Sequence, residues 1–319
     1  MSSLLPVQRA HQLDSRAPEQ QWLVENLWAA EAVGIIGGEP KCGKSFLALD
    51  LAVAVASGQP CLGRFRPGTP GRVLLYAAED APHIVRQRLE GLCATAQIDL
   101  ATLDLFVITA PSLGLDRADD RERLTNTVEK ARAKLLVLDP FVRLHRIDEN
   151  AAGEVAPLLA YLRQLQRKYH LAVAVVHHAR KGAAHARPGQ ALRGSSEFHA
   201  WGDSNLYLRR RADQFLRLTI EHRAAKAPDE VLLELHAEHD ALALRVVESP
   251  ASAASDSART RAAAAERIAQ TLASAAGPLT VRELQAACQM RTDTICKTLD
   301  ALTTAGRVLK SDHGFRLAQ

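Results

Sequence analysis

The sequence predicts an α/β protein: a parallel sheet with helices on both faces and an antiparallel extension, followed by a small C-terminal domain. Apolar runs of strand length alternate with helical patterns, which indicates a parallel sheet buried on both faces. Short alternating strands then follow one another directly, which favours antiparallel pairing in the same sheet. Strands are expected at 32–36, 72–78, 105–110, 134–139 and 171–177, then at 205–208, 215–220, 231–235 and 241–247, with helices at 44–57, 81–96, 117–132 and 152–169.

These patterns divide the chain into a few consecutive parts. A polar lead-in spans residues 1–30, the α/β domain 31–247, a Ser/Ala-rich linker 248–261 and the small C-terminal domain 262–319. A chain of 319 residues is long enough for one large and one small domain.

Composition argues against several classes of protein. The five cysteines include no CxxC pair, so we expect reduced thiols of a cytoplasmic protein, with neither a disulfide framework nor a metal site. No N-terminal segment resembles a signal peptide. The longest apolar tract, residues 47–56, is interrupted by Asp50 and is shorter than the roughly 20 residues that span a bilayer. A net charge of +4 permits nucleic-acid binding without arguing for it.

A phosphate-binding loop is predicted where the first strand of this series meets the first helix. The motif GxxxxGK[ST] occurs there in the strand-to-helix context that it requires. Backbone N–H groups and the helix dipole would hold the β-phosphate, Lys44 would contact the β- and γ-phosphates, and Ser45 would ligate Mg²⁺. The expected ligands are ATP and Mg²⁺; the alternative is an ordinary glycine turn. The nucleotide-binding residues are Gly38, Glu39, Pro40, Lys41, Cys42, Gly43, Lys44, Ser45 and Phe46.

Carboxylates end two of the predicted strands. Asp139 closes an apolar strand, where a P-loop ATPase places the acid that orients Mg²⁺. Glu79 closes another strand and would point toward the ligand crevice of an α/β sheet, where it could orient or deprotonate the attacking water. Asp80 competes for that role, although it could equally cap the helix that begins near Pro82.

Two adjacent histidines, His177 and His178, end the last parallel strand of this series. Alternate strand residues face opposite sides, so only one of them is expected to reach the nucleotide. That residue could sense the γ-phosphate, and the alternative is a pair of structural histidines. A metal site is not expected, because neighbouring strand residues diverge and no further ligand lies at suitable spacing.

Short segments distributed along the chain together resemble the RecA/DnaB-like ATPases, and among them the hexameric replicative helicases of the RepA type from broad-host-range plasmids. They stand in the order and with the spacing of that family and cover about residues 20–245. The matching segments are Gly38–Ser45, Tyr76–Asp80, Leu136–Asp139, Val175–Gly182 and Arg193–Ser196.

This resemblance implies a RecA-like fold and a role for each matched residue. Lys44 and Ser45 would form the nucleotide site, Glu79 would be the catalytic glutamate, Asp139 the Walker B acid and His178 the sensor. The resemblance further implies a homo-oligomeric ring, expected to be a hexamer, with ATP bound between subunits. An arginine would then reach the nucleotide from the neighbouring subunit. Arg223 is the first choice, and the alternatives are Lys226, Arg209, Arg210, Arg88 and a solvated arginine at a strand end.

DNA contacts are expected from two loops and from the C-terminal domain. In RecA-like rings the loops after the corresponding strands line the central channel, where basic side chains neutralise phosphates of single-stranded DNA. Residues 262–319 have the pattern of a winged helix, with Thr280 capping a helix from Val281. Such a domain would bind duplex DNA or, alternatively, a protein. The expected DNA contacts are Arg143 in the first loop, Arg180, Lys181, Arg187 and Arg193 in the second, and Arg291 and Lys297 in the winged helix.

The sequence therefore favours a Mg²⁺-dependent, ring-forming ATPase that acts on DNA as a helicase or translocase, with no membrane association. The alternative is a DNA-binding regulatory or adaptor protein that ATP switches without strand separation.

Overall fold

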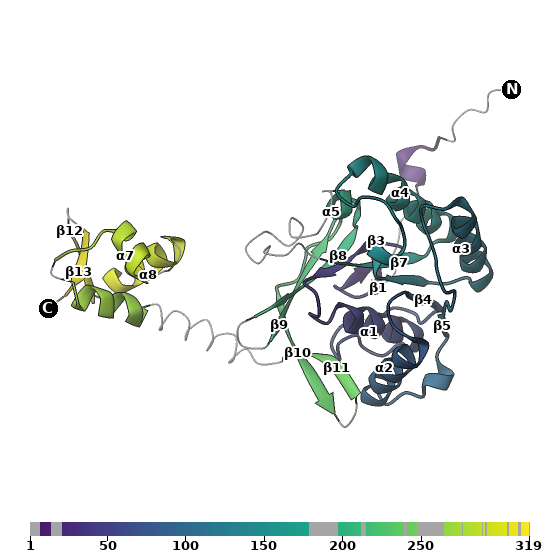
Figure 1. Ribbon diagram of the computed structural model, residues 1–319, viewed down its shortest axis with the longest axis horizontal. Coiled ribbons are helices and arrows are strands. Elements are labelled where there is room, and N and C mark those ends of the chain that lie inside the picture. Colours follow the sequence, from purple (N-terminus) through teal and green to yellow (C-terminus); the bar gives the residue numbers. More distant parts are fainter. Residues whose placement is uncertain are drawn as a thin grey trace. The chain divides into compact units, whose positions relative to one another are not determined.

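The computed structural model divides the chain into two compact units, Met1–Val247 and Glu248–Gln319, which we describe separately (Figure 1). It describes residues 7–13, 21–178, 197–211, 215–238, 241–247, 265–275, 277–288, 290, 292–304, 306–311 and 314–318.

A large sheet forms the centre of the first unit. Within the described residues its nine strands have the order β11-β10-β9-β8-β3-β7-β6-β4-β5. All pairs from β8 through β3, β7, β6 and β4 to β5 are parallel, and β8 to β11 pair antiparallel. The strands are β3 Val33–Gly38, β4 Val73–Ala77, β5 Leu105–Val107, β6 Leu135–Asp139, β7 Ala172–His178, β8 Ser204–Arg210, β9 Leu216–His222, β10 Val231–Glu238 and β11 Ala241–Val246.

Helices cover both faces of the parallel part, as the near-continuous apolar strands predict (Figure 1). Successive residues of β6 enter different cores: Leu135 and Val137 pack with α1 and α2, whereas Leu136 and Leu138 pack with α3 and α4. This alternation follows from the two-residue period of a strand. The helices are α1 Lys44–Ser57, α2 Pro82–Thr95, α3 Ala118–Ala131, α4 Ala152–Tyr169 and α5 Glu197–Trp201, with 3-10 turns η1 Ala10–Gln12, η3 Leu100–Thr102 and η4 Phe141–Arg143.

The structure differs from the sequence expectation at two places. Residues 21–30, assigned to a lead-in, contain the antiparallel pair β1 Trp22–Val24 and β2 Trp28–Ala29. They belong to the core, because the side chains of Leu27 and Trp28 are fully buried. The strand expected to begin the antiparallel extension, β8, instead pairs parallel to β3, so the antiparallel extension begins with β9.

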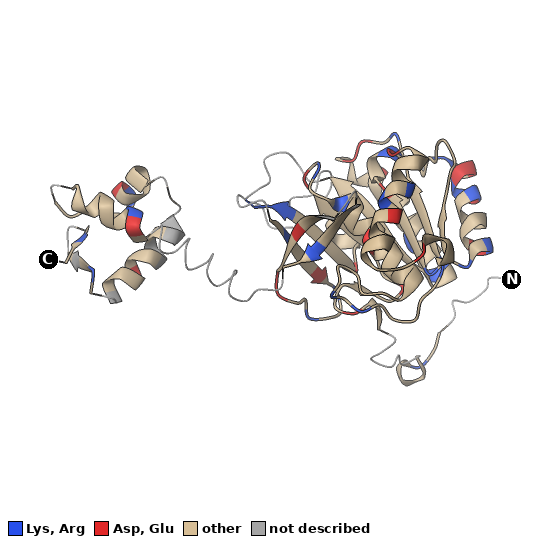
Figure 2. Ribbon diagram, turned by 90° about the horizontal axis from the view of Figure 1, so that it is seen from below, with Lys and Arg blue, Asp and Glu red and all other residues tan. Residues whose placement is uncertain are grey.

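Charged residues of both signs are spread over the first unit (Figure 2). The exposed side of α3 carries Asp119, Arg123 and Lys130 within one helix. Over the described residues, no helix combines the length and apolarity that a bilayer crossing requires.

The second unit contains three helical segments and a two-stranded hairpin around its own core. The segments are residues 265–273, α7 Val281–Cys288 and α8 Thr292–Thr304, and the hairpin consists of β12 Val308–Ser311 and β13 Gly314–Leu317. The predicted cap of α7 is confirmed: Thr280 Oγ1 accepts from the Glu283 N–H at 3.3 Å, and Glu283 Oε2 accepts from the Thr280 N–H at 2.7 Å. This reciprocal pair is a capping box.

Candidate nucleotide site

The loop between β3 and α1 has a backbone that requires glycine. Gly43, at the start of α1, has a φ of 90° in the left-handed region, which side chains disfavour. A Cβ on Gly38 would lie 2.5 Å from the Leu208 carbonyl oxygen of β8. The glycines thus allow this loop to turn tightly between the sheet and the helix.

Lys44 is the buried cation of this loop. Only 5% of the residue is exposed, and its Nζ donates to the Glu39 carbonyl at 2.7 Å. Burial lowers the pKa of its ammonium, while the charges of Asp139 and Glu79 act in the opposite direction. A nucleotide phosphate would supply the negative charge that such a site favours.

Asp139 ends β6 and lies beside the hydroxyl of Ser45. The residue is 8% exposed. Burial raises the pKa of its carboxyl group to about 6, and a hydrogen bond from Ser45 partly opposes this shift. A buried carboxylate next to a hydroxyl suits a hard cation such as Mg²⁺. Among the described residues no group of three His, Cys, Asp or Glu could hold a metal alone, so Mg²⁺ would take its other ligands from phosphate and water.

Glu79 and Asp80 follow β4 and have different partners. Glu79 Oε1 accepts from Arg143 Nε at 2.8 Å, whereas Asp80 pairs with Arg88 of α2. The Arg88 guanidinium carbon lies 5.3 Å from the centre of the Phe46 ring. Both carboxylates line the same cavity, so their partners distinguish them rather than their distance from the site.

The two histidines at the end of β7 have different surroundings. His178 lines the cavity. His177 is 1% exposed and stacks on Phe198 of α5 with ring centres 4.2 Å apart. Its Nδ1 also lies 4.0 Å from Glu149 Oε1. The alternation of strand side chains therefore gives the cavity to His178 and the interior to His177.

These elements enclose a cavity of about 580 Å³, a volume in the range of small-molecule sites. The expected residues Gly38, Glu39 and Cys42 contribute loop backbone without lining it, and the Cys42 side chain is buried against Leu208. The lining residues are Pro40, Lys41, Gly43, Lys44, Ser45, Phe46, Glu79, Asp80, Arg88, Asp139, Pro140, Val176, His178 and Leu235.

Leu235 is a lining residue that sequence reasoning did not identify. It lies on β10, far along the chain from the other lining residues, and is 50% exposed. Its position depends on how the antiparallel strands pair in register, and no local pattern reports that pairing.

A family comparison gives this site its context. Residues 2–184, more than half of the chain, match the model of the AAA domain family. The chain belongs to the AAA domain family. Its AAA domain also resembles the solved structure of a DnaB-like replicative helicase, described with its interactions with primase, at a TM-score of 0.51 and 13% identity. The similar region covers 67% of this chain and 57% of that helicase chain, and it shows a shared RecA-like helicase fold.

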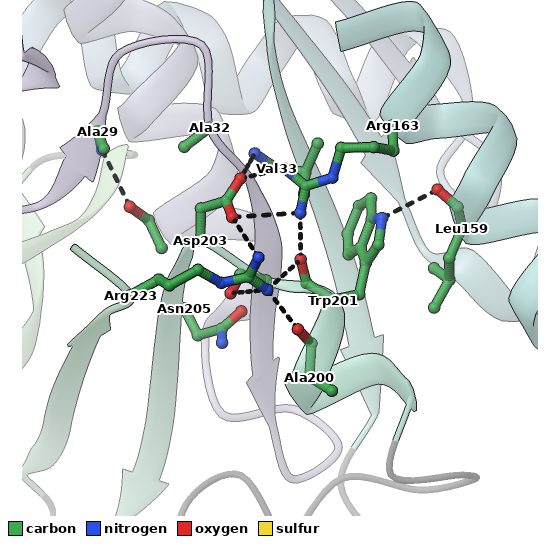
Figure 3. Close-up of polar contacts among 12 residues, drawn as sticks. Ala29, Ala32, Val33, Leu159, Arg163, Ala200, Trp201, Asp203, Asn205 and Arg223 are labelled. Carbon is green, nitrogen blue, oxygen red and sulfur yellow. Dashed lines mark hydrogen bonds and ion pairs between the residues drawn. The ribbon is translucent and has the colours of Figure 1, made fainter. Parts of the chain in front are cut away.

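Arg223 lies outside the cavity lining of the AAA domain. It follows β9, and its guanidinium pairs with Asp203 at 3.3 Å and donates to the carbonyls of Ala200, Trp201 and Gly202 at the end of α5 (Figure 3). Arg163 of α4 approaches the same carboxylate and the Trp201 carbonyl. Within one subunit, Arg223 therefore caps α5 and takes no part in the cavity.

The structure describes two of the expected DNA contacts, one of them only in its backbone. Arg143 lies on η4 and is paired with Glu79. Lys297 lies on α8, and its side chain is outside the described part. Arg180, Lys181, Arg187, Arg193 and Arg291 also lie outside the described residues.

Proposed function

We propose that this chain is a Mg²⁺-dependent ATPase that forms a ring, expected to be a hexamer, and works on DNA as a helicase or translocase. One observation carries the proposal. A single cavity brings together the buried Lys44 of the phosphate loop, the Asp139 carboxylate beside Ser45, and the half-exposed Glu79 on the neighbouring strand.

Each of these residues has a chemical task in the proposed hydrolysis. The loop N–H groups and Lys44 would bind the β- and γ-phosphates and stabilise their charge as the terminal bond breaks. Ser45 and Asp139 would hold Mg²⁺, which neutralises charge on the phosphate oxygens. Glu79 would orient the attacking water and accept its proton, giving ADP and phosphate. His178 would contact the γ-phosphate and respond to its loss.

The ring would complete the site with an arginine from the next subunit. We retain Arg223 as the candidate, since 53% of its side chain is exposed although it caps α5. A guanidinium in that role stabilises charge on the transferred phosphoryl group. Arg209, Arg210 and Lys226 are the neighbouring alternatives.

DNA would be bound in two ways. Arg143, Arg180, Lys181, Arg187 and Arg193 would contact phosphates of a single strand in the channel. The order of three helical segments and a hairpin in the second unit supports a winged helix. Its helix α8 would then bind duplex DNA, with Arg291 and Lys297 as contacts.

The decisive experiment measures ATP hydrolysis with and without single-stranded DNA, together with the native mass in a non-hydrolysable ATP analogue. We expect hydrolysis that DNA stimulates, a ring-sized mass, and loss of hydrolysis in Lys44→Ala. Slow hydrolysis that DNA does not change would favour an ATP-switched regulator instead. Hydrolysis retained in Lys44→Ala would refute the proposed site.

A further inference from the structure

Arg143 joins the candidate catalytic carboxylate to the loop that follows β6. Its Nε donates to Glu79 Oε1 at 2.8 Å. The two residues follow neighbouring parallel strands, β4 and β6. A hydrogen bond of 2.7 Å from the Ala78 N–H to the Asp139 carbonyl connects the ends of these strands. The ion pair therefore has a defined place beside the nucleotide cavity, which Glu79 lines.

Buried neighbours hold the backbone around Arg143. Phe141 and Leu144, on either side of it, are fully buried, and the Leu144 N–H donates to the Phe141 carbonyl at 2.8 Å. Further along the loop, the buried Glu149 lies 4.0 Å from His177. The loop is thus connected to the nucleotide site at two points, through Arg143 to the end of β4 and through Glu149 to β7.

The Arg143–Glu79 pair is open to solvent. The side chain of Arg143 is 62% exposed and that of Glu79 is 43% exposed. Exposed ion pairs are weak, and other ions can displace their partners. A guanidinium binds phosphate as readily as carboxylate, often through two parallel hydrogen bonds. A phosphate that reaches Arg143 would therefore compete directly with Glu79.

The neighbouring pair of Asp80 and Arg88 is less accessible. Its side chains are 28% and 27% exposed, and Arg88 packs over the Phe46 ring. Two adjacent carboxylates thus differ in how easily a solution anion can release them. Asp80 provides a matched control for any effect that depends only on negative charge near the loop.

We propose that Arg143 is a positioning residue that restrains Glu79 until a nucleic-acid phosphate takes its guanidinium. While the pair is formed, one Glu79 oxygen is occupied and the carboxylate is held toward the loop, so it is poorly placed to accept a proton from water. Once a phosphate holds Arg143, Glu79 is free to orient the water and hydrolysis accelerates. This inference rests on the proposed ATPase function and adds the control of that site by nucleic acid.

Thermodynamic linkage makes the effect reciprocal. If phosphate binding at Arg143 releases Glu79, then removing the Glu79 charge must make phosphate binding at Arg143 easier by the same factor. The size of the factor is limited by the strength of an exposed ion pair, which corresponds to about two- to fivefold in an equilibrium constant. The restraint and the DNA affinity can therefore be measured separately.

The first experiment compares ATP hydrolysis without and with oligothymidylate. Arg143→Gln should hydrolyse ATP about two- to fivefold faster than wild type without DNA, and DNA should add little further. Arg143→Lys keeps the charge and should retain most of the stimulation. Arg146→Gln is the control, because Arg146 is an exposed arginine of the same loop without an ion pair among the described residues, and its basal rate should equal that of wild type.

The second experiment needs no hydrolysis, since it measures the affinity for fluorescent oligothymidylate without nucleotide. Glu79→Gln should tighten binding about two- to fivefold in the wild-type background and leave it unchanged in the Arg143→Gln background. Asp80→Asn removes the same charge from the adjacent position, and its effect should not depend on residue 143.

The outcomes separate this inference from the proposed function. A wild-type protein without ATPase activity would end the proposed function, while the binding cycle would still test the Arg143–Glu79 coupling. An unchanged basal rate in Arg143→Gln, with full stimulation by DNA, would overturn the inference even if ATP is hydrolysed. Equal tightening by Glu79→Gln in both backgrounds, or no binding of oligothymidylate at all, would also overturn it.

Discussion

Arg163 of α4 and Asp203, which precedes β8, form an ion pair that uses both carboxylate oxygens (Figure 3). The same carboxylate accepts from the Val33 N–H at 3.3 Å and pairs with Arg223. The side chains of Arg163 and Asp203 are only 18% and 22% exposed. One carboxylate therefore connects a helix, the first strand of the parallel sheet and the turn after β9.

Asp203→Ala should lower the free energy of unfolding of the first unit by roughly 2–4 kcal/mol, because it leaves two arginines and a backbone N–H without their acceptor. Urea unfolding followed by tryptophan fluorescence measures this change. The fluorescence reports the first unit alone, since its residues include all three tryptophans, Trp22, Trp28 and Trp201.

The control for this prediction is Glu90→Ala, which breaks the exposed Arg86–Glu90 pair on α2. A pair of this kind contributes less than about 0.5 kcal/mol. Similar losses in Asp203→Ala and Glu90→Ala would mean that the Arg163–Asp203 pair has no special role.

Glu79→Gln should retain ATP binding and reduce hydrolysis by about 100-fold or more, because it removes the base and leaves the phosphate loop intact. Asp80→Asn should have a smaller effect, since its carboxylate is engaged with Arg88. Single-turnover hydrolysis and nucleotide titration together separate chemistry from binding. The reverse pattern would identify Asp80 as the catalytic carboxylate.

The raised pKa of Asp139, about 6, predicts a pH-dependent stability in the absence of nucleotide. Burial makes the folded state favour the protonated carboxyl group, so this stabilisation is present at low pH. It is lost as the pH rises from the ordinary value near 4 through about 6.

Asp139→Asn should therefore become more stable than wild type as the pH rises through this window, by roughly 1–3 kcal/mol above it. The same substitution should weaken binding of Mg²⁺–ATP. Comparison with wild type at each pH cancels the contribution of Asp50, whose pKa burial also raises to about 6. A stability difference that does not vary with pH would contradict the assignment.

Arg223 gives a prediction about assembly. If it acts on a neighbouring subunit, Arg223→Ala and Lys44→Ala should each lose hydrolysis by about 100-fold or more, and the two mixed together should recover activity. A mixed interface can combine an intact phosphate loop with an intact arginine.

The thermal midpoint of Arg223→Ala must be measured beside its activity, because this arginine also caps α5. Mixed oligomers that assemble and stay inactive would assign Arg223 to that cap alone. Arg209, Arg210 and Arg88 would then be tested in the same way.

Removal of residues 261–319 should leave ATP hydrolysis intact and weaken binding to duplex DNA, because the first unit has its own core. Titration with duplex DNA at several salt concentrations measures the effect. Each lost phosphate contact should reduce the log–log salt slope by about one. An unchanged affinity and slope would favour a protein partner for the second unit.

The local parts of this fold follow closely from the sequence. The helix predicted at 44–57 coincides with α1, since Gly43 and Gly58 flank a continuous apolar pattern and glycine favours the left-handed conformation at such ends. The strand-end positions of Glu79, Asp139 and His178 bring them to one cavity, because parallel strands present their carboxyl ends at the same edge.

The parts that sequence reasoning missed depend on distant residues. The direction of β8 is set by its pairing with β3, and the contact between Arg143 and Glu79 depends on the packing of two strands and a loop. Similarly, Trp22–Ala29 was placed in a lead-in because its strands are too short to show periodicity. Such features follow from tertiary packing, which outweighs local preference.

The position of Leu235 has a consequence for how this protein can diverge. The other residues around the cavity fall within the segment that matches the family, residues 2–184, whereas Leu235 belongs to the later antiparallel strands. One wall of the pocket is thus encoded separately from the residues proposed to perform the chemistry. Substitutions in β10 can reshape the fit for the nucleotide while the phosphate loop and its carboxylates stay as they are, so preference and catalysis can evolve independently.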